Sequence, residues 1–102
     1  MAILHTVNQS PFARNTLGSC IGHAQAGSSI LMIEDGVYGA MQGTAFADVV
    51  KGATADRKVY VLGPDLEARG LNADKLIDGV SVVDYAGFVD LSTECDKVQA
   101  WL

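Results

Sequence analysis

The sequence predicts a small α/β domain with three layers, in which helices flank a mainly parallel sheet of four or five strands. Four short β-rich runs each precede turn residues and then a segment of helical character, the alternation typical of βαβ units. The runs at 29–33 and 58–62 are almost continuously apolar, as expected for strands covered on both faces. A chain of 102 residues is one domain, spanning 1–102.

The first half of the chain predicts two strands and one well-marked helix. The strands are the apolar runs 3–7 and 29–33. Between them, Ser10 is a good N-cap and Pro11 suits the first helical position, so we expect a helix from there to about Gly27. Its apolar stripe begins at Leu17 and continues three, four and seven positions later with Cys20, Ile21 and Ala24. At 100° per residue, Cys20 falls near one edge of this stripe.

The middle of the chain predicts two less regular helical regions around a third strand. One region begins around 35–36 and continues through residue 50, with soft boundaries because it contains several glycines. The third strand is 58–62. A short helix then starts at Pro64 or Asp65, runs to Arg69 and is stopped by Gly70.

The end of the chain predicts a fourth strand, 80–83, and an amphipathic helix. Five apolar residues are spaced by three, four, three and four positions, which gives one continuous face: Phe88, Leu91, Cys95, Val98 and Leu102. We therefore expect the chain to end in a helix docked on the sheet. Cys95 lies in the middle of this face, which predicts a packed structural thiol.

Composition excludes several classes of function. The net charge is −5 and no run of basic residues could follow a phosphate backbone, so direct nucleic-acid binding is not expected. No apolar run could cross a bilayer, and no secretory signal is present, so two cysteines indicate a reduced cytoplasmic setting. The high apolar content, 49%, predicts that part of the surface faces a partner subunit.

Cys20 is the candidate reactive residue. A thiol must lose its proton to attack a sulfane sulfur or a disulfide. Cys20 lies about two turns into the predicted helix, beyond the reach of its dipole, whereas His23 could lend positive charge. The residues alone leave two interpretations open, a reactive thiol and a semi-buried packing residue. His5, inside the first strand, is more typical of a hydrogen-bonded core or interface residue than of a catalyst.

Acidic residues follow the predicted strands, where ligands of open α/β sheets bind. They are Glu34, Asp35, Asp65 and Asp84. A phosphoryl site of the response-regulator kind would also need acids after the first strand, which ends in Asn8 and Gln9. We expect most of these carboxylates to cap helices and turns. No metal-ligand spacing and no glycine-rich phosphate loop is present, so neither a metal nor another cofactor is expected.

Segments along the whole chain resemble the DsrH/TusB family of sulfur-relay subunits. They are ILHTVNQSPF at 3–12, LMIEDGVY at 31–38, VYVLGPDLEARG at 59–70, and the closing stretch from 83–85 through 88–89 to Trp101. The resemblance implies a cytoplasmic heterohexamer with homologous DsrE/TusD-like and DsrF/TusC-like subunits, two copies of each. It also implies a small sulfur donor or acceptor, DsrC-like or TusE-like.

The family has two branches. DsrEFH complexes serve dissimilatory sulfur oxidation, and TusBCD complexes pass persulfide sulfur towards 2-thiolation of the tRNA wobble uridine. A cysteine at the position of Cys20 and the ending TECDKVQAWL are more similar to DsrH, so the sequence favours the oxidation branch. The resemblance also implies that the principal sulfur carrier belongs to the DsrE/TusD subunit. Cys20 is then an accessory persulfide carrier or a partner-facing thiol.

Two further hypotheses stay open beside this one. The chain could be a purely structural subunit that completes the complex and shapes a docking surface. It could also be an independent small-molecule-binding domain of flavodoxin-like architecture, against which the apolar composition and the missing phosphate loop both argue.

Overall fold

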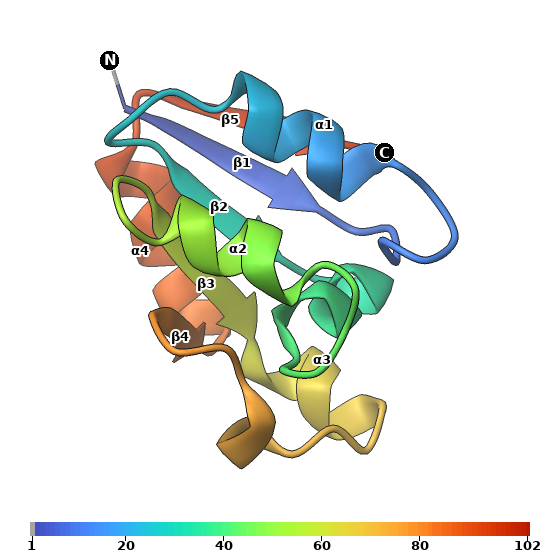
Figure 1. Cartoon of the computed structure of the whole chain (residues 1–102). Coiled ribbons are helices and arrows are strands. Elements are labelled where there is room, and N and C mark those ends of the chain that lie inside the picture. The colour runs from blue at the N-terminus through green and yellow to red at the C-terminus, as the bar shows by residue number, and fades with distance from the viewer. Residues whose placement is uncertain (1) are drawn as a thin grey trace.

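A parallel sheet of five strands runs through the middle of the structure, a computed structural model that describes residues 2–102 (Figure 1). The strands are β1 (Ile3–Val7), β2 (Ser29–Met32), β3 (Lys58–Leu62), β4 (Val80–Val83) and β5 (Lys97–Trp101). Their order across the sheet is β4-β3-β2-β1-β5, and all four pairings are parallel. The predicted fold class is confirmed.

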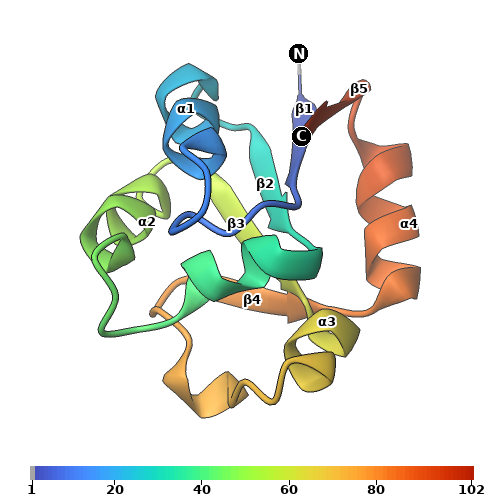
Figure 2. The same ribbon diagram turned by 90° about the vertical axis from the view of Figure 1, so that its right-hand side faces the viewer.

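Helices cover both faces of this sheet. They are α1 (Thr16–His23), α2 (Ala47–Ala53), α3 (Gly63–Ala68) and α4 (Tyr85–Glu94), with 3₁₀ segments η1 (Glu34–Ala40) and η2 (Ala73–Lys75). Figure 2 shows α1 and α2 on one side of the sheet and α4 on the other. The three predicted layers are therefore present, and we call the two sides the α1–α2 face and the α4 face.

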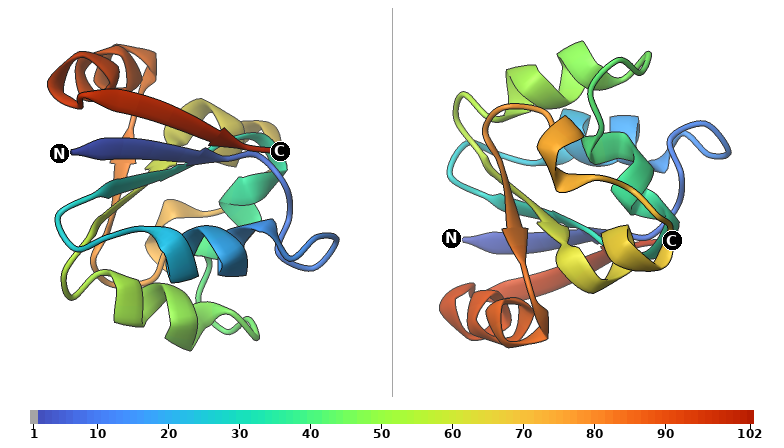
Figure 3. Two further views of the ribbon diagram at one scale, coloured as in Figure 1. Left: turned by 90° about the horizontal axis from the view of Figure 1, so that it is seen from above. Right: turned by 90° about the horizontal axis from the view of Figure 1, so that it is seen from below.

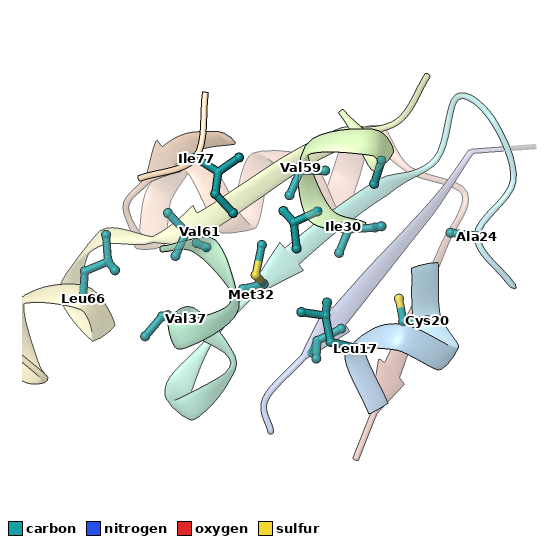
Figure 4. Close-up of a cluster of buried hydrophobic side chains, with 14 residues drawn as sticks. Leu17, Cys20, Ala24, Ile30, Met32, Val37, Val59, Val61, Leu66 and Ile77 are labelled. Atoms are coloured by element: carbon teal, nitrogen blue, oxygen red, sulfur yellow. The ribbon is translucent and has the colours of Figure 1, made fainter. Parts of the chain in front are cut away.

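Successive side chains of each strand alternate between the two faces and form two apolar clusters. The larger cluster lies on the α1–α2 face and includes Val7, Ile30 and Val61 from the strands, together with Leu17 and Val50 from the helices (Figure 4). The smaller cluster lies on the α4 face, where Leu4 and Leu31 meet Leu91. Most of the buried apolar surface, and so most of the hydrophobic stabilisation, is on the α1–α2 face.

The first helix is shorter than the sequence predicts. Ser10 accepts hydrogen bonds, but they close a single turn: its carbonyl accepts from the backbone N–H of Ala13 (3.1 Å) and Arg14 (3.0 Å), and its Oγ accepts from Phe12 (3.2 Å). Helix α1 begins only at Thr16, and it ends at His23 because the backbone of Ala24 turns to an extended conformation. The predicted limits at Ser10 and Gly27 are wrong.

The helical regions in the middle of the chain are partly as predicted. The region expected over 35–50 is divided into η1 and α2, and the residue after η1, Met41, forms an isolated antiparallel bridge with Leu76. The short helix is confirmed to within one residue at each end, because α3 spans Gly63–Ala68. Gly70 follows it with a φ of 67°, the left-handed conformation that favours glycine after a helix.

The largest correction concerns the end of the chain. Helix α4 stops at Glu94, and Lys97–Trp101 forms a strand rather than the predicted helical continuation. β5 pairs with β1 from Ile3↔Lys97 to Val7↔Trp101, and Figure 3 shows the two strands side by side. Without β5, β1 would be an edge with unpaired backbone groups. The helical spacing of Val98 and Leu102 relative to α4 is therefore coincidental.

Candidate functional site

Helix α1 places Cys20 inside the molecule rather than at a rim. Its side chain is 0% exposed and belongs to the larger apolar cluster, where Figure 4 shows it beside Leu17. The predicted position near an exposed edge is wrong, since the whole residue is covered. Burial raises the pKa of the Cys20 thiol to about 12, because an apolar environment disfavours the thiolate. In this conformation the thiol is neutral at pH 7 and out of reach of a partner.

Arg57 is the positively charged residue that acts on the Cys20 thiol. Its charge lowers the pKa of the thiol, but less than burial raises it. The guanidinium donates from Nη1 to the backbone carbonyls of Ile21 and of Ala24, the latter at 3.2 Å. These carbonyls lie at the C-terminal end of α1, where a positive charge is favourable to the helix dipole. Sequence reasoning missed Arg57, because its link to α1 spans 36 positions in the chain.

Cys95 lies directly after α4, as its C-cap residue. Its side chain is partly buried and packs against the smaller apolar cluster of Leu4, Leu31 and Leu91. The prediction of a packed thiol is confirmed, although the continuous helical face from which it came does not exist. Both cysteines are free thiols.

The two histidines meet the single tryptophan at the junction of α1, β1 and β5. Trp101 Nε1–H donates to Nδ1 of His5 at 3.0 Å, and the ring of His23 lies 5.7 Å from the indole ring. His5 is 4% exposed, which confirms its prediction as a hydrogen-bonded core residue. Nδ1 of His23 lies 2.8 Å from the carbonyl oxygen of Ser19, on the same helix. The sequence did not predict this cluster, because it placed Trp101 on a helix.

Three of the four acidic side chains after the strands hold parts of the structure together. Asp84 Oδ1 accepts from the N–H of Gly87 at 2.8 Å and caps α4, as predicted. Asp65 accepts from the backbone N–H of Glu34 at 2.6 Å. Asp35 pairs with the guanidinium of Arg69 at 2.9 Å instead of capping a turn.

An open hollow of about 580 Å³ lies beside Asp84, between the starts of α3 and α4. Its lining residues are Gly63, Pro64, Glu67, Val82, Val83, Asp84 and Gly87. Within residues 2–102, no group of three or more histidine, cysteine or acidic side chains is arranged to hold a metal ion. The hollow has no phosphate-binding glycine loop and no thiol, so its chemistry is that of a surface groove.

The described helices do not include one with the length and hydropathy that a membrane-spanning segment requires. 

The fold is shared with solved structures of low sequence similarity. The structure described as "Crystal structure of ychN protein from E.coli" superposes with a TM-score of 0.86 at 17% identity, covering 98% of both chains. A protein of unknown function, MTH1491 from Methanobacterium thermoautotrophicum, gives a TM-score of 0.74, also at 17% identity, over 96% of this chain and 97% of that one. The chain therefore has the same fold as these proteins, a small α/β domain with a parallel sheet.

The family follows from sequence comparison. The family model described as "DsrH like protein" matches residues 9–98. Protein TusB of Erwinia tasmaniensis is 36% identical over 99 residues, and Protein TusB of Escherichia coli is 30% identical over 99 residues. Each match covers 97% of this chain and 100% of the relative. The chain is a member of the DsrH/TusB family.

Proposed function

We propose that this protein is a TusB-type subunit of a cytoplasmic sulfur relay, in which sulfur passes between proteins as a cysteine persulfide on the way to 2-thiouridine in tRNA. The observation that carries the proposal is the match to proteins named TusB over 97% of the chain and their full length. The oxidation branch, which the sequence favours, has less support, because these curated relatives carry the TusB name.

The proposed role is to present a surface to homologous TusC-like and TusD-like subunits and to a TusE-like sulfur acceptor. Large apolar side chains are exposed on the α4 face: Tyr85 is 60% exposed and Val89 is 61% exposed. Val98 on β5 is also half exposed. Apolar groups in such positions are typical of subunit contacts. We therefore assign partner binding to α4 and β5, with the α1–α2 face turned away.

Co-purification tests this surface. We expect Val89→Glu to abolish recovery of the homologous subunits with the tagged chain, because it places a charge in an apolar contact. The matched control is Val49→Glu on α2, a valine that is 45% exposed on the opposite face. Equal loss of partners in both variants, or in neither, contradicts the assignment of the interface to α4.

Deletion of the gene in its own host tests the function. For a TusB-type subunit, we expect tRNA hydrolysates to lose 2-thiouridine in mass spectrometry, and the wild-type gene to restore it. The second candidate, a DsrH-type subunit that exchanges sulfur with a DsrC-like protein, is favoured by the cysteine at position 20. It predicts unchanged 2-thiouridine and impaired oxidation of stored sulfur. A deletion strain normal in both respects contradicts a sulfur-relay function.

The carrier role of Cys20 stays a prediction that needs α1 to move aside. In that step the Cys20 thiolate attacks the outer sulfur of a partner persulfide, which forms the Cys20 persulfide and releases the partner as a thiolate. Intact-mass analysis of the assembled complex after treatment with a persulfide donor tests it. A gain of one sulfur in wild type and in Cys95→Ser, but not in Cys20→Ser, supports the carrier role. Equal gain in all three proteins, or in none, contradicts it.

A further inference from the structure

The hydrogen bond between Trp101 and His5 fixes the protonation state of the histidine. An indole N–H can only donate, so Nδ1 of His5 must be the bare, accepting nitrogen at 3.0 Å. Neutral His5 therefore carries its proton on Nε2. Within residues 2–102, this buried Nε2 has no hydrogen-bond partner. The hydrogen bond from Trp101 thus requires a neutral His5, and the N–H at Nε2 of this neutral ring has no acceptor among the described residues.

Protonation of His5 is incompatible with this contact. The imidazolium carries N–H groups on both nitrogens, so Nδ1 would turn from an acceptor into a donor that faces the N–H of Trp101. The charged ring would also be buried, at 4% exposure, with no acceptor from the described residues at Nε2. Burial of an unpaired charge is costly, so the ring and the indole must separate when the proton binds.

The elements around His5 supply no carboxylate that would stabilise its charged form. His5 is the one titratable residue of β1 and β2, and the only charged residue within β5 is Lys97. The titratable groups of α1 are Cys20 and His23, and Arg57 lies at the end of that helix. Asp96 is bound to the backbone N–H of Ala2 at 2.9 Å.

Burial accordingly lowers the pKa of His5 below its ordinary value of 6.5. The unfolded chain binds this proton more readily than the folded chain. The stabilisation that depends on neutral His5 is therefore fully present above pH 6.5 and is lost as the pH falls through the lower pKa of the folded state.

The contact matters to β5 because this strand has a neighbour on one side only. It is an edge strand, paired with β1 alone. Its first four side chains are exposed, and Trp101 is the residue of β5 that is partly buried against the larger apolar cluster. We propose that the hydrogen bond from Trp101 to His5 is a pH-sensitive latch that holds β5 on the sheet, and that protonation of His5 opens it. Because β5 borders the exposed α4 face, opening alters that surface.

NMR spectroscopy of the full chain tests the latch, since Trp101 is the single tryptophan and its indole N–H gives one resolved signal. The background variant is His23→Gln, because it removes the second imidazole ring beside the indole, whose centroid lies 5.7 Å away. Between pH 7.5 and 5, we expect the indole signal to shift with a midpoint below 6.5. Over the same range, amide protection in β5, corrected for intrinsic exchange, should fall roughly two- to tenfold, the loss expected for one hydrogen bond. Protection in β3 should stay constant.

The decisive control is His5→Asn in the same background, because the amide oxygen keeps an acceptor near the position of Nδ1 but does not titrate. The latch predicts that both pH-dependent changes disappear in this variant. Changes that persist in His5→Asn, or β5 protection that follows β3 at every pH, overturn the proposal. If His5→Asn does not fold, the ring signals of His5 in His23→Gln decide. A midpoint below 6.5 that coincides with the indole shift supports the latch, and one at or above 6.5 overturns it.

Discussion

The two faces of the sheet differ in how completely their side chains are covered. On the α1–α2 face, Leu17, Cys20 and Val50 are wholly buried in one large cluster. On the α4 face, one helix covers a small cluster, and Tyr85 and Val89 remain exposed. Since buried apolar area is the main source of stability, the α1–α2 face contributes most of the stability of the fold, and the less covered α4 face is the one that we propose for partner binding. Cys20, the candidate reactive thiol, lies on the α1–α2 face.

The reactivity of the two cysteines gives the largest expected difference between the faces. At pH 8, a thiol with a pKa of about 12 is ionised in roughly one molecule in ten thousand. We expect iodoacetamide to modify Cys20 about a thousandfold more slowly than an exposed thiol of ordinary pKa. The rate should rise with pH, because the thiolate fraction grows as the pH approaches 12.

Mass spectrometry of the Cys95→Ser variant measures the rate at which iodoacetamide modifies Cys20. The Cys20→Ser variant gives the corresponding rate for the partly buried Cys95. Modification of Cys20 in the folded chain as fast as in urea would mean that α1 does not cover it in solution.

Truncation of one side chain on each face gives the next largest effect. Leu17→Ala leaves a cavity in the larger cluster, and we expect it to lower the free energy of unfolding by about 2–5 kcal/mol. Val89→Ala removes an exposed side chain of α4, so its effect should stay within about 0.5 kcal/mol. Urea unfolding followed by circular dichroism measures both. Comparable losses would show that α4 carries as much of the stability as α1.

Replacement of two arginines gives a smaller difference. Arg57→Met removes charged donors from two carbonyls at the end of α1, and we expect a loss of about 1.5–3 kcal/mol in the free energy of unfolding. The matched variant is Arg69→Met, which breaks an ion pair with the exposed Asp35 beyond the carboxyl ends of the strands, together with longer contacts to the carbonyl (3.3 Å) and the carboxylate (4.0 Å) of Asp65. Such a pair contributes about 0.2–1 kcal/mol. An Arg57→Met protein as stable as Arg69→Met would contradict the role of Arg57 in holding α1.

Sequence patterns predicted four of the five strands, the edge strand β4 among them, and missed the other edge strand, β5. β1, β3 and β4 have their predicted limits and β2 ends one residue earlier than predicted, because short β-rich runs bounded by turn residues are a strong strand signal. β5 was missed because Val98 and Leu102 continue the helical spacing of α4. Lys97, Gln99 and Trp101 share one face of the strand, but two of them are polar, so that face gives no comparable apolar signal.

The same omission bears on the errors at the site. The helical spacing puts Cys20 near one edge of the apolar stripe of its helix, and a sheet that ended at β1 would leave that flank uncovered. The added strand brings Trp101 against the cluster that contains Cys20, so the flank is closed. The contacts of Arg57 with α1, and of Trp101 with His5, join residues 36 and 96 positions apart. No local pattern can predict such contacts.

The pairing of β1 with β5 has a consequence for how the protein is made. Ala2 and Asp96, which directly precede the two strands, are hydrogen-bonded to each other although they lie 94 positions apart in the chain. Closing a loop of that length costs about 4 kcal/mol in chain entropy beyond a constant contribution, and such distant contacts form slowly. Until residues 97–101 leave the ribosome, β1 presents a bare edge to every neighbouring nascent chain. We expect this interval to be when the protein is most prone to aggregate and most dependent on chaperones.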